Sequence, residues 1–213
     1  MYKVLSNNPE ERSNVTYSWA YWDNGFNDDE LKKIEEICSS NELQKATVVG
    51  TQDEQELEKI RKSKVHFYTK DENTSWIFDK FNSIITTINE NYYNYNLNGY
   101  RDFQYTEYHA SEDGKYDWHM DILHGQSTPN TTRKLSVVMC LSDPEKDFEG
   151  GEFEINVGNQ NEPEKVIMKR GRIIFFPSYL IHRVNPVTRG IRKSIVIWVV
   201  GPKFMWLITC VAA

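Results

Sequence analysis

Apolar residues recur at helical spacing in the first third of the chain. One stripe comprises Leu31, Ile34, Ile37 and Cys38, and the segment Asn27-Asp-Asp-Glu30 before it has the form of a capping box. A second stripe begins after Thr74 and comprises Trp76, Ile77, Phe81, Ile84, Ile85 and Ile88. Both stripes predict amphipathic helices that bury one face against a core.

From about Tyr100 the pattern changes to short β runs separated by turns. The run 135–141 is apolar on both faces, as in an interior strand. The run 153–157 alternates apolar and polar residues, as in a strand with one solvent-exposed face. Further runs cover 64–68, 103–108, 172–176 and 194–200. Short strands at these intervals predict an α+β fold with a double-sheet jelly roll, with the N-terminal helices packed outside one sheet. We expect one domain, in which residues 1–99 form a mainly helical support region and 100–202 the jelly-roll core.

Composition narrows the class of partner. The chain has 213 residues and a formal charge of −6, which disfavours nucleic acid as the main partner because phosphate binding needs clustered Lys and Arg. Cys38, Cys140 and Cys210 form no CxxC pair or disulfide framework, which favours the cytoplasm. Residues 1–11 lack the pattern of a signal peptide, and the apolar segment 205–213 is too short to span a bilayer, so no membrane partner is expected. We expect segment 205–213 to form a last strand or a tail packed on the core.

The most informative candidate chemistry lies at His119-Met-Asp121. Alternate residues of a strand point to the same face, so both side chains can reach one pocket. His182, which follows a strand ending at Pro177, can complete a set of two imidazoles and one carboxylate. Oxygen-activating ferrous iron favours that set and leaves its other coordination positions open. Zinc also suits it, so a cupin-like isomerase or a zinc site is an alternative.

Arg192 lies ten residues after His182, in a strand of Ile and Val. A buried guanidinium is costly unless a carboxylate meets it, so Arg192 pairs either with an internal Asp or Glu or with the carboxylate of a ligand. Ser194 shares its strand face and would add a hydroxyl donor. Tyr116 differs in parity from His119, so we expect it to pack beneath the site, where it can still border a substrate entrance. Segment 122–133 reads as a long loop beside the site.

Several motifs together resemble the iron(II)- and 2-oxoglutarate-dependent dioxygenases, in particular the prolyl 4-hydroxylase branch with its PKHD-type hydroxylases. The resemblance covers about Tyr100 to Pro202, and Arg61-Lys-Ser63 also resembles a segment of these proteins. The motifs that carry it are Gln104-Tyr-Thr-Glu-Tyr108, Tyr116-Asp-Trp-His-Met-Asp121, Arg133-Lys-Leu-Ser136, Phe148-Glu-Gly-Gly-Glu-Phe153, Gly171-Arg-Ile-Ile-Phe-Phe-Pro177, His182-Arg-Val184 and Arg192-Lys-Ser194.

The resemblance implies a double-stranded β-helix with a metal at its open end. His119, Asp121 and His182 would bind Fe(II). Arg192 and Ser194 would bind the distal carboxylate of the cosubstrate 2-oxoglutarate, and Tyr108 would line its pocket. Cys140 stands where some relatives place a tyrosine against this carboxylate.

The activity implied is hydroxylation of an unactivated C–H bond with O2, with ascorbate as an optional reductant. The preferred substrate is a prolyl residue in a protein or peptide, and a small-molecule substrate remains open. A catalytically silent interaction scaffold is the other alternative, since a fold does not determine a function.

Overall fold

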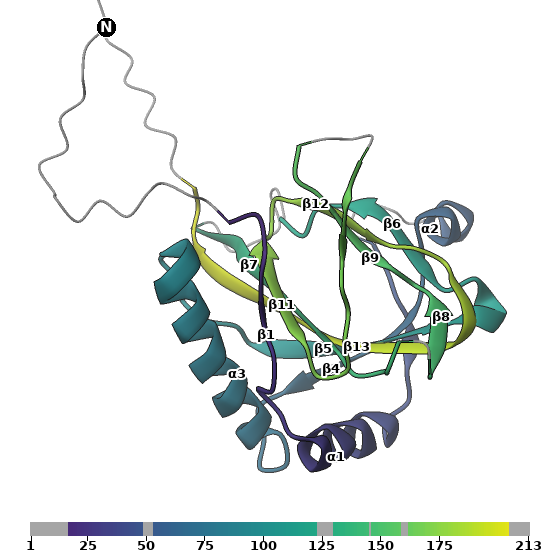
Figure 1. The fold of residues 1–213 in the computed structure, drawn as a ribbon, viewed down its shortest axis with the longest axis horizontal. Coiled ribbons are helices and arrows are strands. Elements are labelled where there is room, and N and C mark those ends of the chain that lie inside the picture. The colour runs from purple at the N-terminus through teal and green to yellow at the C-terminus, as the bar shows by residue number, and fades with distance from the viewer. Residues whose placement is uncertain (1–16, 49–52, 123–129, 145, 159–161, 205–213) are drawn as a thin grey trace, which may run out of the picture.

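The computed structural model describes residues 17–48, 53–122, 130–144, 146–158 and 162–204, whose strands form two facing sheets (Figure 1). The larger sheet has the order β1-β11-β7-β13-β5-β4-β2, with β8 paired to β13, and the smaller sheet has the order β10-β9-β12-β6-β3. The strands of the larger sheet are β1 (Ala20–Trp22), β2 (Gln44–Lys45), β4 (Lys64–Thr69), β5 (Asp102–His109), β7 (Thr131–Cys140), β8 (Phe148–Gly150), β11 (Ile173–Pro177) and β13 (Val187–Pro202). Those of the smaller sheet are β3 (Arg61–Lys62), β6 (Lys115–His119), β9 (Phe153–Asn156), β10 (Glu164–Val166) and β12 (Ile181–Val184). The predicted α+β jelly roll, a double-stranded β-helix, is confirmed.

Helices α1 (Asp28–Ser39) and α3 (Ser75–Ile88) lie against the outer face of the larger sheet (Figure 1). Both were predicted. The capping box is present, because Asn27 accepts from the Glu30 amide over 2.9 Å and Glu30 accepts from the Asn27 amide over 2.9 Å. Helix α2 (Glu54–Ile60) leads into β3, and α3 continues into a π-helical turn, Asn89–Tyr93. Strands β1 to β4 show that the first 99 residues also extend both sheets.

Two apolar cores lie on opposite faces of the larger sheet. In β11, Ile173 and Phe175 belong to the core under α1 and α3, whereas Ile174 and Phe176 belong to the core between the two sheets. The period of two in a strand therefore explains why this run is apolar throughout. The same alternation in β13 places Ile195 in the helix-side core.

Strand β7 begins at Thr131, earlier than the run 135–141 indicated, and β13 begins at Val187, earlier than 194. Both extensions contain polar and charged residues that are held by pairing with neighbouring strands, so hydrophobicity alone did not reveal them. Residues 131–133 of the expected loop 122–133 are thus strand, and residues 123–129 of it lie outside the described residues. The expectations for residues 1–11 and 205–213 also lie outside them.

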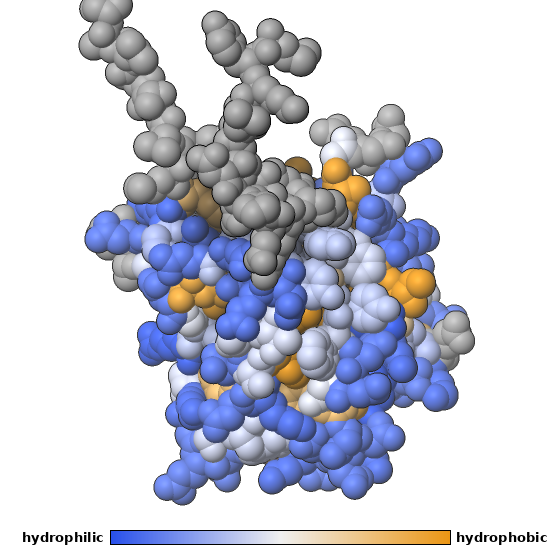
Figure 2. Space-filling model, turned by 60° about the vertical axis from the view of Figure 1, so that its left-hand side comes forward, coloured by the Kyte–Doolittle hydropathy of each residue, from blue (hydrophilic) through white to orange (hydrophobic). Residues whose placement is uncertain are grey.

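Hydrophilic residues cover most of the face seen in Figure 2, and apolar residues appear there as small separate patches. In the described part of the chain, no helix combines the length and apolar character that crossing a membrane requires.

Candidate metal centre

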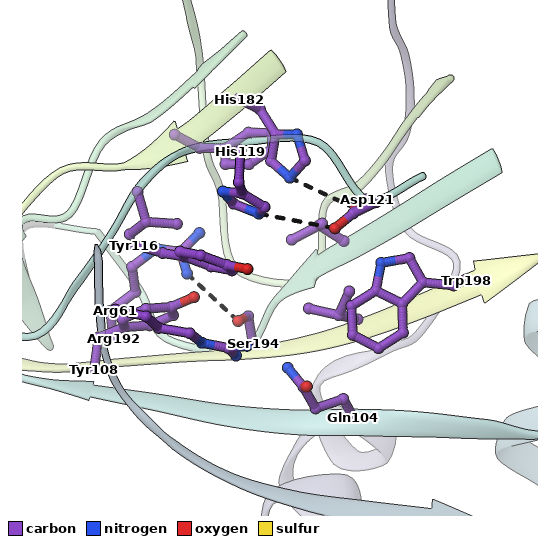
Figure 3. A pocket seen from close by; sticks show the side chains of 14 residues that line it. Arg61, Gln104, Tyr108, Tyr116, His119, Asp121, His182, Arg192, Ser194 and Trp198 are labelled. Carbon is purple, nitrogen blue, oxygen red and sulfur yellow. Dashed lines mark hydrogen bonds and ion pairs between the residues drawn. The ribbon is translucent and has the colours of Figure 1, made fainter. Parts of the chain in front are cut away.

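Three candidate metal ligands from separate parts of the chain converge between the sheets (Figure 3). His119 ends β6 and His182 lies directly opposite it on the antiparallel strand β12. The two imidazole centroids are 4.1 Å apart as a result. With Asp121, each residue offers one ligand atom, and these atoms all lie within 4.8 Å of one another. The structure therefore brings together the three residues that the sequence indicated.

Asp121 reaches this position from outside the strand. It lies two residues beyond the end of β6, so strand alternation was the wrong reason for its orientation. Instead, the backbone amides of Asp121 and Ile122 donate to the carbonyl of Ser178 over 3.0 and 2.9 Å. The Ser136 hydroxyl donates to Asp121 Oδ2 over 2.7 Å. These hydrogen bonds fix the carboxylate beside both histidines.

Each imidazole is oriented by a backbone carbonyl. His119 Nδ1 lies 2.7 Å from the Asp117 oxygen, and His182 Nδ1 lies 2.9 Å from the Leu180 oxygen. A carbonyl only accepts, so we assign the ring hydrogen to Nδ1 in both residues. The Nε2 lone pairs are then directed toward Asp121, at 3.8 Å from Oδ1 for His119 and 3.5 Å from Oδ2 for His182. Oriented imidazoles of this kind are typical of metal ligands.

The electrostatics of the site favour the ligand forms of these groups. Burial, and the proximity of His182, lower the pKa of His119 to about 3, so its imidazole is neutral near pH 7. Burial acts to raise the pKa of the Asp121 carboxyl, but the adjacent histidines and the Ser136 hydrogen bond outweigh it and keep the pKa below its usual value. A neutral imidazole and an ionised carboxylate are what a metal cation requires.

Tyr116 also faces the site, so the expectation that it packs beneath was wrong. His182 pairs with His119 and Val184 with Tyr116, so between these two pairs β6 has two residues and β12 has one. This β-bulge puts Tyr116 and His119 on one side despite their odd separation. The Tyr116 ring stacks on the His119 ring at 3.4 Å between centroids and 12° between planes.

Arg192 extends from β13 into the same pocket and is only 1% exposed. Its Nη1 lies 3.4 Å from the Ser194 hydroxyl, and its guanidinium carbon lies 5.4 Å from the Tyr108 ring centroid. Its Nε and Nη2 have no hydrogen-bond partner among the described residues. No ion pair to an Asp or Glu was found for it in this part of the chain either, which leaves the ligand interpretation of Arg192 as the better supported one.

The pocket has an empty volume of about 400 Å³, including the part open to solvent. Arg61, Gln104 and Trp198 line it in addition to the residues above (Figure 3). Gln104 shares the inner face of β5 with Tyr108, so strand parity was a signal that would have found it. Arg61 comes from β3, whose two residues carry no strand pattern, and only its place in a family-like segment indicated it.

His109, which ends β5, and Cys140, which the sequence singled out, lie outside the metal cluster. His109 pairs with Glu107, at 2.7 Å between Nε2 and Oε2. Cys140 is fully buried opposite Ser194, where burial raises the pKa of its thiol to about 11, and the thiol donates to the Ser142 carbonyl over 3.2 Å.

Comparison with known proteins agrees with this geometry. Residues 103–200, which carry most of the pocket, match the family described as the 2OG-Fe(II) oxygenase superfamily. That match covers a little under half of the chain. Among curated relatives, this chain is 36% identical over 88 residues to a PKHD-type hydroxylase of Pseudomonas fluorescens, with 40% of this chain and 38% of the relative covered. It is 34% identical over 91 residues to one of Alteromonas mediterranea, with 42% and 39% covered. The matched segment therefore spans well under half the length of these curated relatives.

Solved structures show the same fold. A prolyl-4-hydroxylase of Pseudomonas putida superposes with a TM-score of 0.67 at 18% identity, over 86% of this chain and 92% of that chain. A prolyl hydroxylase of Trichoplax adhaerens, in complex with a hypoxia-inducible-factor peptide fragment, gives a TM-score of 0.68 at 19% identity, over 87% and 84%. At these identities the likeness is one of fold.

Proposed function

We propose that this protein is an Fe(II)- and 2-oxoglutarate-dependent dioxygenase that hydroxylates an unactivated C–H bond. One observation carries the proposal. The His119, Asp121 and His182 cluster shares a buried pocket with Arg192, whose guanidinium retains two unpartnered nitrogens among the described residues. The cluster would hold the iron. Arg192 and Ser194 would bind the distal carboxylate of 2-oxoglutarate, with Tyr108 beside them.

The donor set fits ferrous iron of this type. Two neutral imidazoles and a carboxylate on one side of a cation leave positions for a chelating cosubstrate and O2. In the described part of the chain, the only cluster of potential ligands has three members, so a closed four-ligand structural zinc site is disfavoured there. The buried guanidinium of Arg192 in the same pocket would bind the second carboxylate of a diacid cosubstrate. A cupin-like isomerase needs no such cosubstrate.

The protein contributes placement and exclusion of water. When bound, iron would activate O2, and 2-oxoglutarate would supply two of the electrons that reduce it during hydroxylation of a C–H bond. Arg192 fixes one end of the cosubstrate, since a planar guanidinium binds a carboxylate bidentately. The rings of Phe153 and Phe176, in the core between the sheets, lie 5.6 and 4.6 Å from the His182 ring, which is 3% exposed.

We further propose a prolyl residue of a protein or peptide as the preferred substrate, acted on in the cytoplasm. Support comes from relatives that are PKHD-type hydroxylases and from the shared fold with a prolyl hydroxylase bound to a peptide. A small acid or amino acid is the alternative substrate.

The test is succinate release by the purified chain with Fe(II), 2-oxoglutarate and ascorbate, with and without proline-containing peptides. We expect metal-dependent succinate, stimulated by a productive peptide and absent in His182→Ala. Confirmed binding of iron and 2-oxoglutarate without any succinate would instead favour a silent scaffold.

A further inference from the structure

A second arginine is buried in the pocket. Arg61, the first residue of β3, lies opposite Tyr116 of β6 and is 7% exposed. Its Nε donates to the Ser63 hydroxyl over 2.8 Å, and its guanidinium carbon lies 4.5 Å from the Tyr116 ring centroid. The Tyr116 ring thus lies between Arg61 and the candidate ligand His119 (Figure 3). The guanidinium is therefore one aromatic ring away from the metal site.

No protein carboxylate balances this charge in the part of the chain that the structure describes. Arg61 forms no ion pair there, and Asp121, the acidic residue that lines the pocket, already faces His119, His182 and Ser136. Segment 123–129, which follows Asp121 closely in the chain, contains no Asp or Glu in its sequence. One hydroxyl and one ring face only partly offset the cost of burying a guanidinium without an anion.

When Fe(II) and 2-oxoglutarate are bound, as the proposed function requires, Arg61 is the charged group of the site that has no counter-charge. Two positive charges of Fe(II) are balanced by Asp121 and by the carboxylate of 2-oxoglutarate at the metal. The distal carboxylate balances Arg192. Arg133, whose guanidinium carbon lies 3.8 Å from the Trp198 ring centroid, has Asp102 as its counter-charge: burial lowers the pKa of Arg133, and the field of Asp102 acts against that effect. Arg61 alone among these groups keeps a full charge without a counter-charge.

We propose that Arg61, oriented by Ser63, binds a carboxylate of the substrate. The substrate is then an acid-bearing molecule, a prolyl peptide with an acidic residue next to the proline. A planar guanidinium suits a carboxylate, and a buried site makes the pairing stronger than at the surface. Arg61 is thus a specificity-determining residue, separate from the clamp on the cosubstrate.

The test compares three acetylated and amidated tripeptides, Gln-Pro-Gln, Glu-Pro-Gln and Gln-Pro-Glu. Their binding to the protein loaded with Mn(II) and N-oxalylglycine, an inert mimic of 2-oxoglutarate, is measured by calorimetry. We expect at least one acidic peptide to bind about tenfold tighter, or more, than the neutral one, as for hydrogen bonds to charged groups. Arg61→Gln should remove this preference and Arg61→Lys should keep part of it.

Lys62→Gln is the matched control. It removes the same charge from the next residue, which pairs with the exposed Asp113 instead of facing the pocket, so it should leave the preference intact. Unchanged affinity of Arg61→Gln for N-oxalylglycine shows that the pocket is still folded. Equal affinities for the three peptides, binding of none of them, or a preference that survives in Arg61→Gln would overturn the inference. The proposed function fails separately, by absence of metal-dependent succinate.

Discussion

Ser136 donates its hydroxyl hydrogen to Oδ2 of Asp121 over 2.7 Å. Ser136 is fully buried, and its oxygen lies 2.9 Å from the hydroxyl of Ser178, whose carbonyl accepts from the Asp121 amide. Ser136 of β7 therefore holds the side chain of Asp121, and Ser178, which follows β11, holds its backbone. Oδ2 is occupied in this way, and Oδ1 remains available to a cation.

Ser136→Ala should weaken metal binding by about tenfold to a hundredfold, the range for groups that orient a metal ligand. The carboxylate loses a donor and can rotate away from the two histidines. Mn(II) affinity by calorimetry measures the effect. Ser142→Ala is the control, because Ser142 is also buried but donates to the Ile191 carbonyl over 3.1 Å, remote from the ligands. Equal losses of Mn(II) affinity in both variants would show that Ser136 stabilises the fold in general and does not orient Asp121 specifically.

His182→Ala should abolish detectable Fe(II) binding. The change removes one of three ligands from a set whose members come from separate segments, and the remaining pair cannot enclose one side of the cation. Anaerobic calorimetry with Fe(II) tests this. His109→Ala is a suitable control, since His109 pairs with Glu107 outside the cluster. Retention of wild-type affinity in His182→Ala would remove that residue from the site.

The sequence predicted α1, α3 and the interior strands because their signals are local, whereas α2 was not predicted. Thr74 marks the start of α3, and the apolar stripe of α1 follows a complete capping box. His119 and His182 were indicated as ligands by their motifs, but their pairing across β6 and β12 was not predicted. Local patterns were sufficient wherever backbone geometry is regular.

The remainder depends on non-local contacts. The bulge that turns Tyr116 to the His119 side is set by pairing with Val184, which alternation within one strand does not contain. Asp121 is oriented by Ser178, 57 positions later in the chain by number, through hydrogen bonds that leave no periodic signal. Arg61 enters the pocket from a two-residue strand. The roles of such residues can be identified only from the pairing of the strands in the folded structure.

Arg192→Ala should weaken 2-oxoglutarate binding by about 1.5–3 kcal/mol, the range for hydrogen bonds to a charged group. The truncation removes the guanidinium that faces the pocket and leaves Ser194 alone at that end. Titration of the Mn(II)-loaded protein with 2-oxoglutarate gives the difference. Lys193→Gln, one residue along β13 with its side chain on the alternate face, should bind as the wild type does. Equal affinity of Arg192→Ala and wild type would place the cosubstrate elsewhere.

Asp23→Asn should lower the free energy of unfolding at pH 7 by about 1–2 kcal/mol, a charged hydrogen-bond value discounted for partial exposure. Asp23 accepts from Nε and Nη2 of Arg172, each over 2.8 Å, and these hydrogen bonds lower the pKa of its carboxyl. A lowered folded-state pKa gives stability that is present above the ordinary value of 3.8 and lost as the pH falls through the folded value. Urea unfolding should therefore show the two proteins converging below about pH 4. Asp29→Asn, at an exposed pair, should show little difference at either pH.

Gly190→Ala should destabilise the fold far more than Gly99→Ala. Both glycines have positive φ, +72° and +121°, so each alanine carries backbone strain. At Gly190, however, a Cβ would lie 1.9 Å from the Asp147 carbonyl oxygen, whereas at Gly99 it would meet nothing within 4 Å. We expect a loss of more than about 2 kcal/mol at Gly190, where β13 passes β8 just before Arg192, and about 1 kcal/mol at Gly99. Urea unfolding of both variants measures this, and equal losses would show that the segment around Asp147 yields freely to the added methyl group.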